Sequence, residues 1–113
     1  MSKPIISDDP LYLLLRDGKV AEFNKRIAAG EKAVLSCCDF RHADLRGLEA
    51  KGIDFSNAYF RQADLRGIDF LDCDNIEGAS FHAAKISGAR FPPILKAEEI
   101  MLSLQFGTRV RYQ

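Results

Sequence analysis

A five-residue period governs the middle of this chain. From Ala33 to Phe91 a large apolar residue recurs at almost every fifth position, and the pentapeptide Ala-Asp-Leu-Arg-Gly occurs twice, at 43–47 and 63–67. A period of five matches neither the 3.6-residue turn of an α-helix nor the two-residue alternation of a straight strand. The chain must therefore turn a corner at every repeat.

We call the large apolar residue of each repeat its centre; the residue two positions earlier is almost always small or apolar. Four corners close a coil of twenty residues, so the twelve centres make about three coils. Stacking the sequence at this interval produces four apolar columns, which predicts a packed interior as the main source of stability. The columns are Leu35/Phe55/Ile76, Phe40/Phe60/Phe81, Leu45/Leu65/Ile86 and Ala50/Phe70/Phe91.

The period slips once. Eleven residues separate Phe70 from Phe81, where ten are expected. A one-residue bulge is the simplest account, with the ladder resuming after it. We expect Ile76 to point inward and the segment from Asp72 to Asn75 to be displaced outward, either as a tolerated insertion or as a recognition feature.

Through these repeats, residues 33–91 resemble the pentapeptide-repeat family. The resemblance implies a mainly β solenoid, a short right-handed quadrilateral β-helix in which the centre and the small residue before it both point inward. It implies little about activity, because members of the family serve many roles. Related proteins often dimerise end to end, and one branch of the family mimics DNA and binds type II topoisomerases.

We expect a single domain over residues 1–113, with the repeats closed at each end, because an open solenoid exposes strand edges and core. Residues 1–32 read as a helical hairpin. Asp8-Asp9-Pro10 supplies an N-cap and a first-turn proline, and a second helix from about 19 to 29 stops at Gly30. The hairpin is interpreted as a cap or as an independent partner-binding helix pair.

Residues 92–113 form the other end. Pro92-Pro93 ends the coil, because proline cannot donate to the ladder. A helix is expected over residues 97–105, closed by Gly107, and residues 108–112 alternate enough for a short strand. The helix carries more apolar surface than one coil needs, which indicates either a monomeric cap or a homodimer through this end. The candidate dimer or cap surface is Ile100, Met101, Leu104 and Phe106.

The charges are balanced, with sixteen basic and sixteen acidic residues, so no overall field favours direct nucleic-acid or membrane binding. Outward charges flank the centres, and they are either a solvated, mutually neutralising ladder or a stripe that recognises a carboxylate or phosphate on a partner. The candidate partner-binding stripe is Arg41, Arg46, Arg61 and Arg66.

Catalytic, cofactor-binding and metal-binding residues are not expected. His42 and His82 fall on outward, solvated positions of different corners, and the spacing of Cys37 and Cys38 to His42 does not match a zinc site. Cys38 falls on an inward position. The odd number of cysteines fits a reducing compartment, and the charged first twenty residues offer neither a signal peptide nor a spanning helix, so a cytoplasmic location is expected.

These observations predict a non-enzymatic protein–protein interaction or scaffold module that needs no cofactor and has an unidentified protein partner. The alternative is a DNA mimic that binds a type II topoisomerase or another nucleic-acid-binding protein. A mimic needs a long acidic rod, whereas residues 33–91 carry nine acidic and seven basic side chains. Three coils would also span only about four base pairs.

Overall fold

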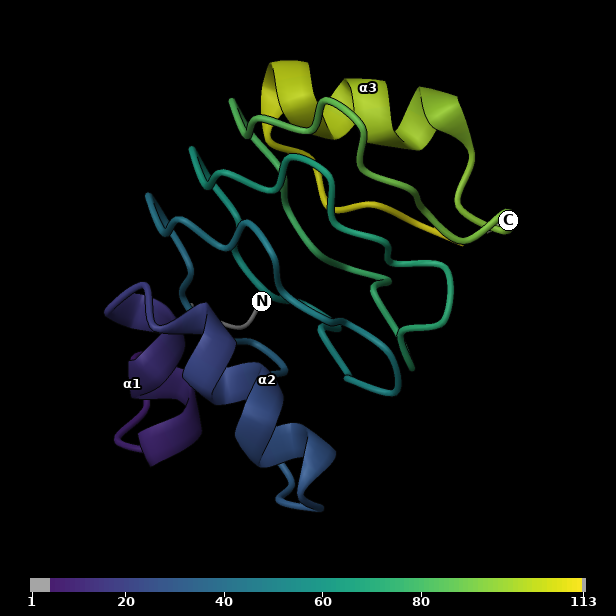
Figure 1. The fold of residues 1–113 in the computed structure, drawn as a ribbon. Coiled ribbons are helices and arrows are strands. Elements are labelled where there is room, and N and C mark those ends of the chain that lie inside the picture. Colours follow the sequence, from purple (N-terminus) through teal and green to yellow (C-terminus); the bar gives the residue numbers. More distant parts are fainter. Residues whose placement is uncertain (1–4, 113) are drawn as a thin grey trace.

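The chain forms a stack of coils with helices at both ends (Figure 1). The computed structural model describes residues 5–112. In chain order the elements are α1 (Pro10–Arg16), α2 (Val20–Ala28), the coils and α3 (Ala97–Phe106). The helices α1 and α2 lie against the first coil, and α3 lies over the last. Residues 1–4 of the expected N-terminal cap, and Gln113, lie outside the described residues.

Neighbouring coils are joined by a parallel backbone ladder. Asp39 bridges to Tyr59 and Asp44 to Asp64, an interval of twenty residues; Tyr59 then bridges to Ser80, an interval of twenty-one. Each bridge is isolated because the chain turns again within five residues, so the solenoid is built from single bridges rather than extended strands. The expected coil length is confirmed, and the longer second interval records the inserted residue.

The inward columns fill the interior. All twelve centres are buried except Ile86 and Phe91 of the last coil, which are half-buried and pack against the core. Phe60 stacks on Phe40 with ring centroids 5.5 Å apart, and Phe81 stacks on Phe60 at 5.3 Å. A buried Phe contributes roughly 1.5–3 kcal/mol, and an aromatic pair adds about 0.5–1.5 kcal/mol. The stacked rings therefore tie each coil to the next.

Most corners are β-turns whose third residue has a positive φ. At one of them, the N–H of Ala43 donates to the C=O of Phe40 over 3.1 Å, and His42 has φ 64°. Glycine favours this conformation because it has no β-carbon to crowd the following carbonyl. Five corners nevertheless carry another residue there, and these are Cys37, His42, Asn57, Gln62 and Ala83.

The residue before a centre often caps the next turn. Its side-chain oxygen accepts a hydrogen bond from the backbone N–H two residues later, as in an Asx-turn. The acceptors are Asp39, Asp44, Asp54, Asp64, Asp69 and Asn75, at 2.8–3.3 Å. The repeated outward Asp residues thus help to shape the corners.

The inserted residue lies opposite Asp54. The N–H of Asp74 donates to the C=O of Ile53 over 2.9 Å, as in a ladder with a spacing of twenty residues. The N–H of Phe55 donates to the C=O of Asn75 over 2.7 Å, as in a ladder with a spacing of twenty-one. Asp74 and Asn75 therefore both face Asp54, as the two residues of a bulge face one partner residue.

The positions around this bulge correct one expectation. Ile76 is fully buried, as expected. Cys73, however, is half-buried and packs against the core. The expectation that the whole segment from Asp72 to Asn75 is displaced outward was wrong, because the interval changes only after Asp74 and Cys73 keeps the inward place of the first register.

The N-terminal hairpin forms where the sequence places it. Asp9 caps α1 by accepting from the N–H of Leu11 at 2.9 Å, and Pro10 opens the helix. The helices bury Leu11 and Leu15 of α1, together with Val20 and Phe23 of α2, against the core; Tyr12 is also fully buried.

Side chains of this hairpin pair with backbone groups on the lower edge of the first coil. The Tyr12 hydroxyl donates to the C=O of Asp39 at 2.5 Å. The Asn24 side chain donates to the C=O of Gly47 at 2.9 Å and accepts from the N–H of Glu49 at 3.0 Å. The hairpin therefore substitutes for the missing coil below.

At the other end, α3 runs one residue past its expected end to Phe106, and Gly107 closes it with φ 74°. The tail then runs antiparallel to the last coil through a bridge between Arg109 and Ser80, and Val110 is fully buried. Arg111 joins this tail to α3 through Glu99, with 3.0 Å between guanidinium and carboxylate. The expected strand is thus a single bridged residue.

The corner geometry predicts opposite effects for two exchanges at equivalent turn positions. Gln62→Gly removes an exposed side chain from a position with φ 59°, so we expect stabilisation by about 0.5 kcal/mol, the net of relieved crowding and glycine's greater unfolded-state entropy. Gly67→Ala, at φ 76° with open space around its Cα, should destabilise by about 1 kcal/mol. Urea unfolding measures both, and equal signs would contradict the assignment.

Candidate protein-interaction surfaces

Three Asp-x-Arg units repeat on the outer surface of the coils. In each, the Arg side chain returns to the Asp two residues before it. The closest contacts are 2.7 Å for Arg41 to Asp39, 2.8 Å for Arg46 to Asp44 and 2.7 Å for Arg66 to Asp64. Because the same Asp also accepts the Arg backbone N–H, each unit is a local, preformed structure.

The structure divides the candidate stripe into two columns. Arg46 also reaches Asp64 of the next coil at 3.4 Å, so Arg46 and Arg66 share two carboxylates and their charge is neutralised. The residue two positions before Arg61 is Tyr59 rather than an Asp, and within residues 5–112 Arg61 makes no ion pair. Arg41 and Arg61 stack at one corner, since the N–H of His42 donates to the C=O of Arg61 at 2.9 Å. That the stripe binds a partner remains a prediction.

Arg contacts lower the pKa of the carboxyls they hold. The hydrogen bond from the Arg66 side chain is the largest cause that brings the pKa of Asp64 to about 2, and Arg46 contributes. Burial alone would raise the pKa of Asp39, but the hydrogen bonds and charge of Arg41 outweigh it and the pKa is lowered. These carboxyls therefore stay ionised in mild acid.

A second arginine site joins the tail to the second coil. The guanidinium of Arg109 lies over the Tyr59 ring, 4.8 Å from its centroid, and donates to the Tyr59 hydroxyl at 2.6 Å. It also donates to the C=O of Gly78 at 2.9 Å. Sequence reasoning missed this contact because fifty residues separate the partners and no repeat relates them.

The histidines and cysteines occupy separate places. His42 is exposed, as expected. His82 is half-buried beside Gly107, and its Nδ1 is enclosed without a hydrogen-bond partner, so the expected solvated position was wrong for His82. Gly107, which ends α3, lies against the His82 side chain. Cys38 is buried as expected, and burial raises the pKa of its thiol to about 11.

Possible metal ligands do not converge in the part of the chain that the structure describes: no group of three or more His, Cys, Asp or Glu side chains is placed to hold an ion. Among residues 5–112, every helix is too short or too polar to cross a bilayer.

The candidate dimer or cap surface also divides into two. Ile100 is buried and Leu104 half-buried against the last coil, so these two residues act as a cap. Met101 and Phe106 are 60% and 65% exposed, and the neighbouring Leu102 is 41% exposed. The outer side of α3 thus leaves three large apolar side chains in solvent.

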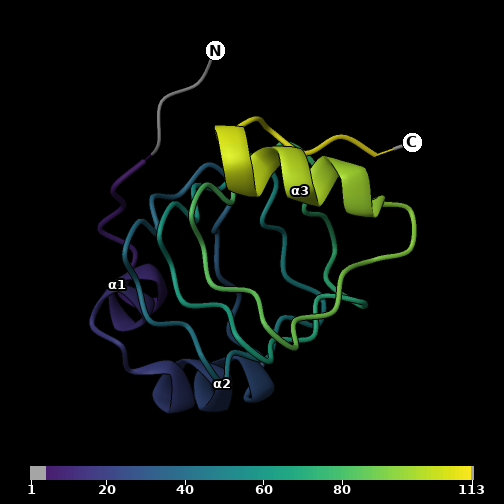
Figure 2. The same ribbon diagram turned by 90° about the horizontal axis from the view of Figure 1, so that it is seen from above.

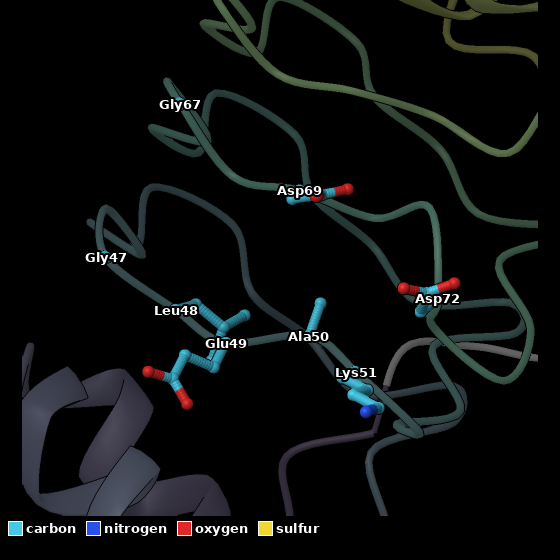
Figure 3. A pocket seen from close by; sticks show the side chains of 8 residues that line it. All are labelled: Gly47, Leu48, Glu49, Ala50, Lys51, Gly67, Asp69 and Asp72. Atoms are coloured by element: carbon cyan, nitrogen blue, oxygen red, sulfur yellow. The ribbon is translucent and has the colours of Figure 1, made fainter.

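A shallow hollow of about 410 Å³ lies on the coil face formed by residues 47–51 and 67–72 (Figure 3). Glu49, Lys51, Asp69 and Asp72 carry its charges. Figure 3 shows the Glu49 carboxylate directed away from Asp69 and Asp72, so these groups do not converge on a common point. An acid–base pair, which requires groups within reach of one substrate atom, is not assembled here.

The bridged coils and inward columns define a repeat solenoid. A family model for pentapeptide repeats matches the chain over residues 33–72 and 53–91, in eight copies, and together these matches cover just over half of it. The chain therefore belongs to the pentapeptide-repeat family, whose members are generally non-enzymatic structural or interaction modules. Comparison with curated proteins and with solved structures found no significant match.

The lowered pKa of Asp64 predicts an acid-dependent contribution to stability. Because the pKa falls from its ordinary value of 3.8 to about 2 on folding, the stabilisation is complete above about pH 4 and is lost as the pH falls towards 2. Asp64→Asn should be less stable than wild type at pH 6, with the difference shrinking by pH 2.5. Urea unfolding across this range tests it.

The control is Asp8→Asn, which removes an exposed carboxylate from the N-terminal segment. A difference between wild type and Asp64→Asn that stays constant with pH would contradict the ion-pair account.

Proposed function

We propose that this protein is a non-enzymatic protein–protein interaction module that associates through its C-terminal end. The observation that carries the proposal is the outer side of α3, where Met101, Leu102 and Phe106 remain exposed after Ile100 has covered the last coil. Large apolar side chains grouped on one surface commonly mark an interface. A second copy of the chain is the proposed partner, joined end to end.

The coil surface supports a binding role rather than a chemical one. The interior is filled by the centres, and the outer Asp and Arg side chains hold each other in rigid units. Such a surface presents fixed charges without having to order them on binding, which reduces the entropic cost of association.

DNA mimicry is less well supported. A mimic requires a continuous acidic surface, whereas Asp39, Asp44 and Asp64 each lie within 2.8 Å of an Arg guanidinium nitrogen. Such pairing removes the phosphate-like field that a DNA-binding protein would recognise.

The dimer predicts a defined response to charge on α3. Wild-type protein should move from monomer to dimer mass in light scattering as its concentration rises, and Met101→Glu/Phe106→Glu should stay monomeric because charge in an apolar interface is costly. Ala21→Glu, which adds charge at an exposed position of α2 at the opposite end of the stack, is the matched control and should behave as wild type. Monomer mass for the wild type throughout would refute the proposal.

A further inference from the structure

The upper edge of each coil offers a fixed set of backbone donors. In the second coil, the N–H of a centre donates to the coil above, as Phe60 does to the C=O of Ser80 at 2.8 Å. The N–H of the third turn residue does the same, as Gly67 does to the C=O of Ser87 at 2.9 Å. The last coil presents the same set with no fourth coil above it.

The tail and α3 pair with the upward N–H groups of residues 76–83, the first half of the last coil. The N–H of Gly78 donates to the C=O of Val110 at 2.7 Å, and that of Phe81 donates to the Ser103 hydroxyl at 2.8 Å. Ile76 and Ala83 are likewise paired, to the Tyr112 hydroxyl at 2.9 Å and the C=O of Leu104 at 3.0 Å.

The second half, residues 84–91, is left open. Within residues 5–112, the N–H groups of Ile86, Gly88 and Phe91 and the carbonyls of Ala84 and Ala89 have no hydrogen-bond partner. Ile86 and Phe91 are also the two centres that remain half-exposed. Figure 2 shows α3 and the tail over one side of the coil stack, with the rest of the last coil in view. This edge therefore combines unpaired backbone groups with partly exposed core.

The charged residues of this edge, Lys85 and Arg90, indicate which kind of strand would fit above it. Lys85 bridges to Asp64 below, and Arg90 bridges to Asp69, with 3.5 Å between guanidinium and carboxylate. Opposite charges on adjacent strands are favourable. A strand added above would gain from acidic residues over Lys85 and Arg90, while its alternate residues would cover the exposed centres with apolar side chains.

A second copy is a poor occupant of this edge. In a twofold pairing the same edge meets itself, so Lys85 and Arg90 would face the Lys85 and Arg90 of the second copy. Like charges directly opposite one another on paired strands are destabilising. The edge is therefore better matched to a different chain than to itself.

We propose that residues 84–91 are a backbone-pairing site for a segment of a partner protein that turns the corner with them, with apolar residues facing Ile86 and Phe91 and acidic residues above Lys85 and Arg90. The bound segment acts as the start of a fourth coil, with its backbone completing the open donors and acceptors. This site deepens the proposed interaction function and rests on it, but it is separate from the outer side of α3.

Amide hydrogen exchange with a synthetic peptide tests the site. The probe is the acetylated, amidated octapeptide Ala-Asp-Leu-Arg-Gly-Ile-Asp-Phe, the sequence of residues 63–70, which pairs with the lower edge of residues 84–91 in the fold. In the free protein the amides of Ile86, Gly88 and Phe91 should exchange fast, while that of Leu65, bonded at 2.8 Å, is protected. Saturating peptide should slow the three edge amides by at least about tenfold.

Two matched comparisons separate the charge from the backbone contribution. Lys85→Glu/Arg90→Glu should weaken peptide binding about tenfold, and Lys51→Glu, a reversal away from the edge, should leave it unchanged. Replacing both Asp residues of the peptide by Lys should weaken binding by a similar factor. Protection of Leu65 in each variant shows that the coils remain folded.

Three results would overturn the proposal. The first is unchanged exchange of the three edge amides at millimolar peptide. The second is equal binding of the Asp and Lys peptides. The third is protection of the edge that rises with protein concentration in the absence of peptide, which would assign it to a second copy. Light scattering of the α3 variants reads a different surface, so either proposal can fail alone.

Discussion

The parallel ladder between coils is the constraint on which the rest of this structure depends. Each corner must leave one N–H and one C=O directed along the stack, and the next coil must meet them after twenty residues or, beyond the bulge, twenty-one. The ladder fixes where the centres stack, so Phe40, Phe60 and Phe81 lie face to face. It also fixes where the outward Asp residues stand, each positioned to cap the turn that follows.

The ends show what such a ladder requires when it stops. At the N-terminal end, side chains of Tyr12 and Asn24 supply the donors and the acceptor that a coil below would have provided. At the C-terminal end the replacement is incomplete: the tail and α3 serve the half of the last coil around Ile76 and Phe81 and leave the half around Ile86 and Phe91 open. The C-terminal end therefore keeps a contiguous open half, whereas at the N-terminal end helix side chains reach Asp39, Gly47 and Glu49.

The charged surface follows from the same geometry. The side chain of an Asp that precedes a centre is fixed by its hydrogen bond to the backbone N–H two residues later. An Arg at that later position therefore contacts the carboxylate directly, and no contact between distant segments is needed. Exposed pairs of this kind contribute little to stability individually, typically about 0–1 kcal/mol. Their effect is to fix the direction of the charges. Within the coils, Arg61 and Arg90 are the arginines that lie outside an Asp-x-Arg unit.

The sequence alone determined the coil length, the inward columns, the single slip and the three helices, because a period of five admits one way of burying a large residue at every corner. It also predicted that Ile76 stays inside. The tertiary structure decided that Cys73 stays with it, that His82 lies under Gly107, and that Ile100 caps the core while Met101 and Phe106 do not. It also decided that Arg109 contacts Tyr59 and that the upper backbone groups of residues 84–91 remain unpaired within residues 5–112. The place of Cys73 is set by the ladder at the bulge. The other outcomes depend on how α3 and the tail pack on the last coil, and no period in the sequence encodes contacts between segments that lie outside the repeat.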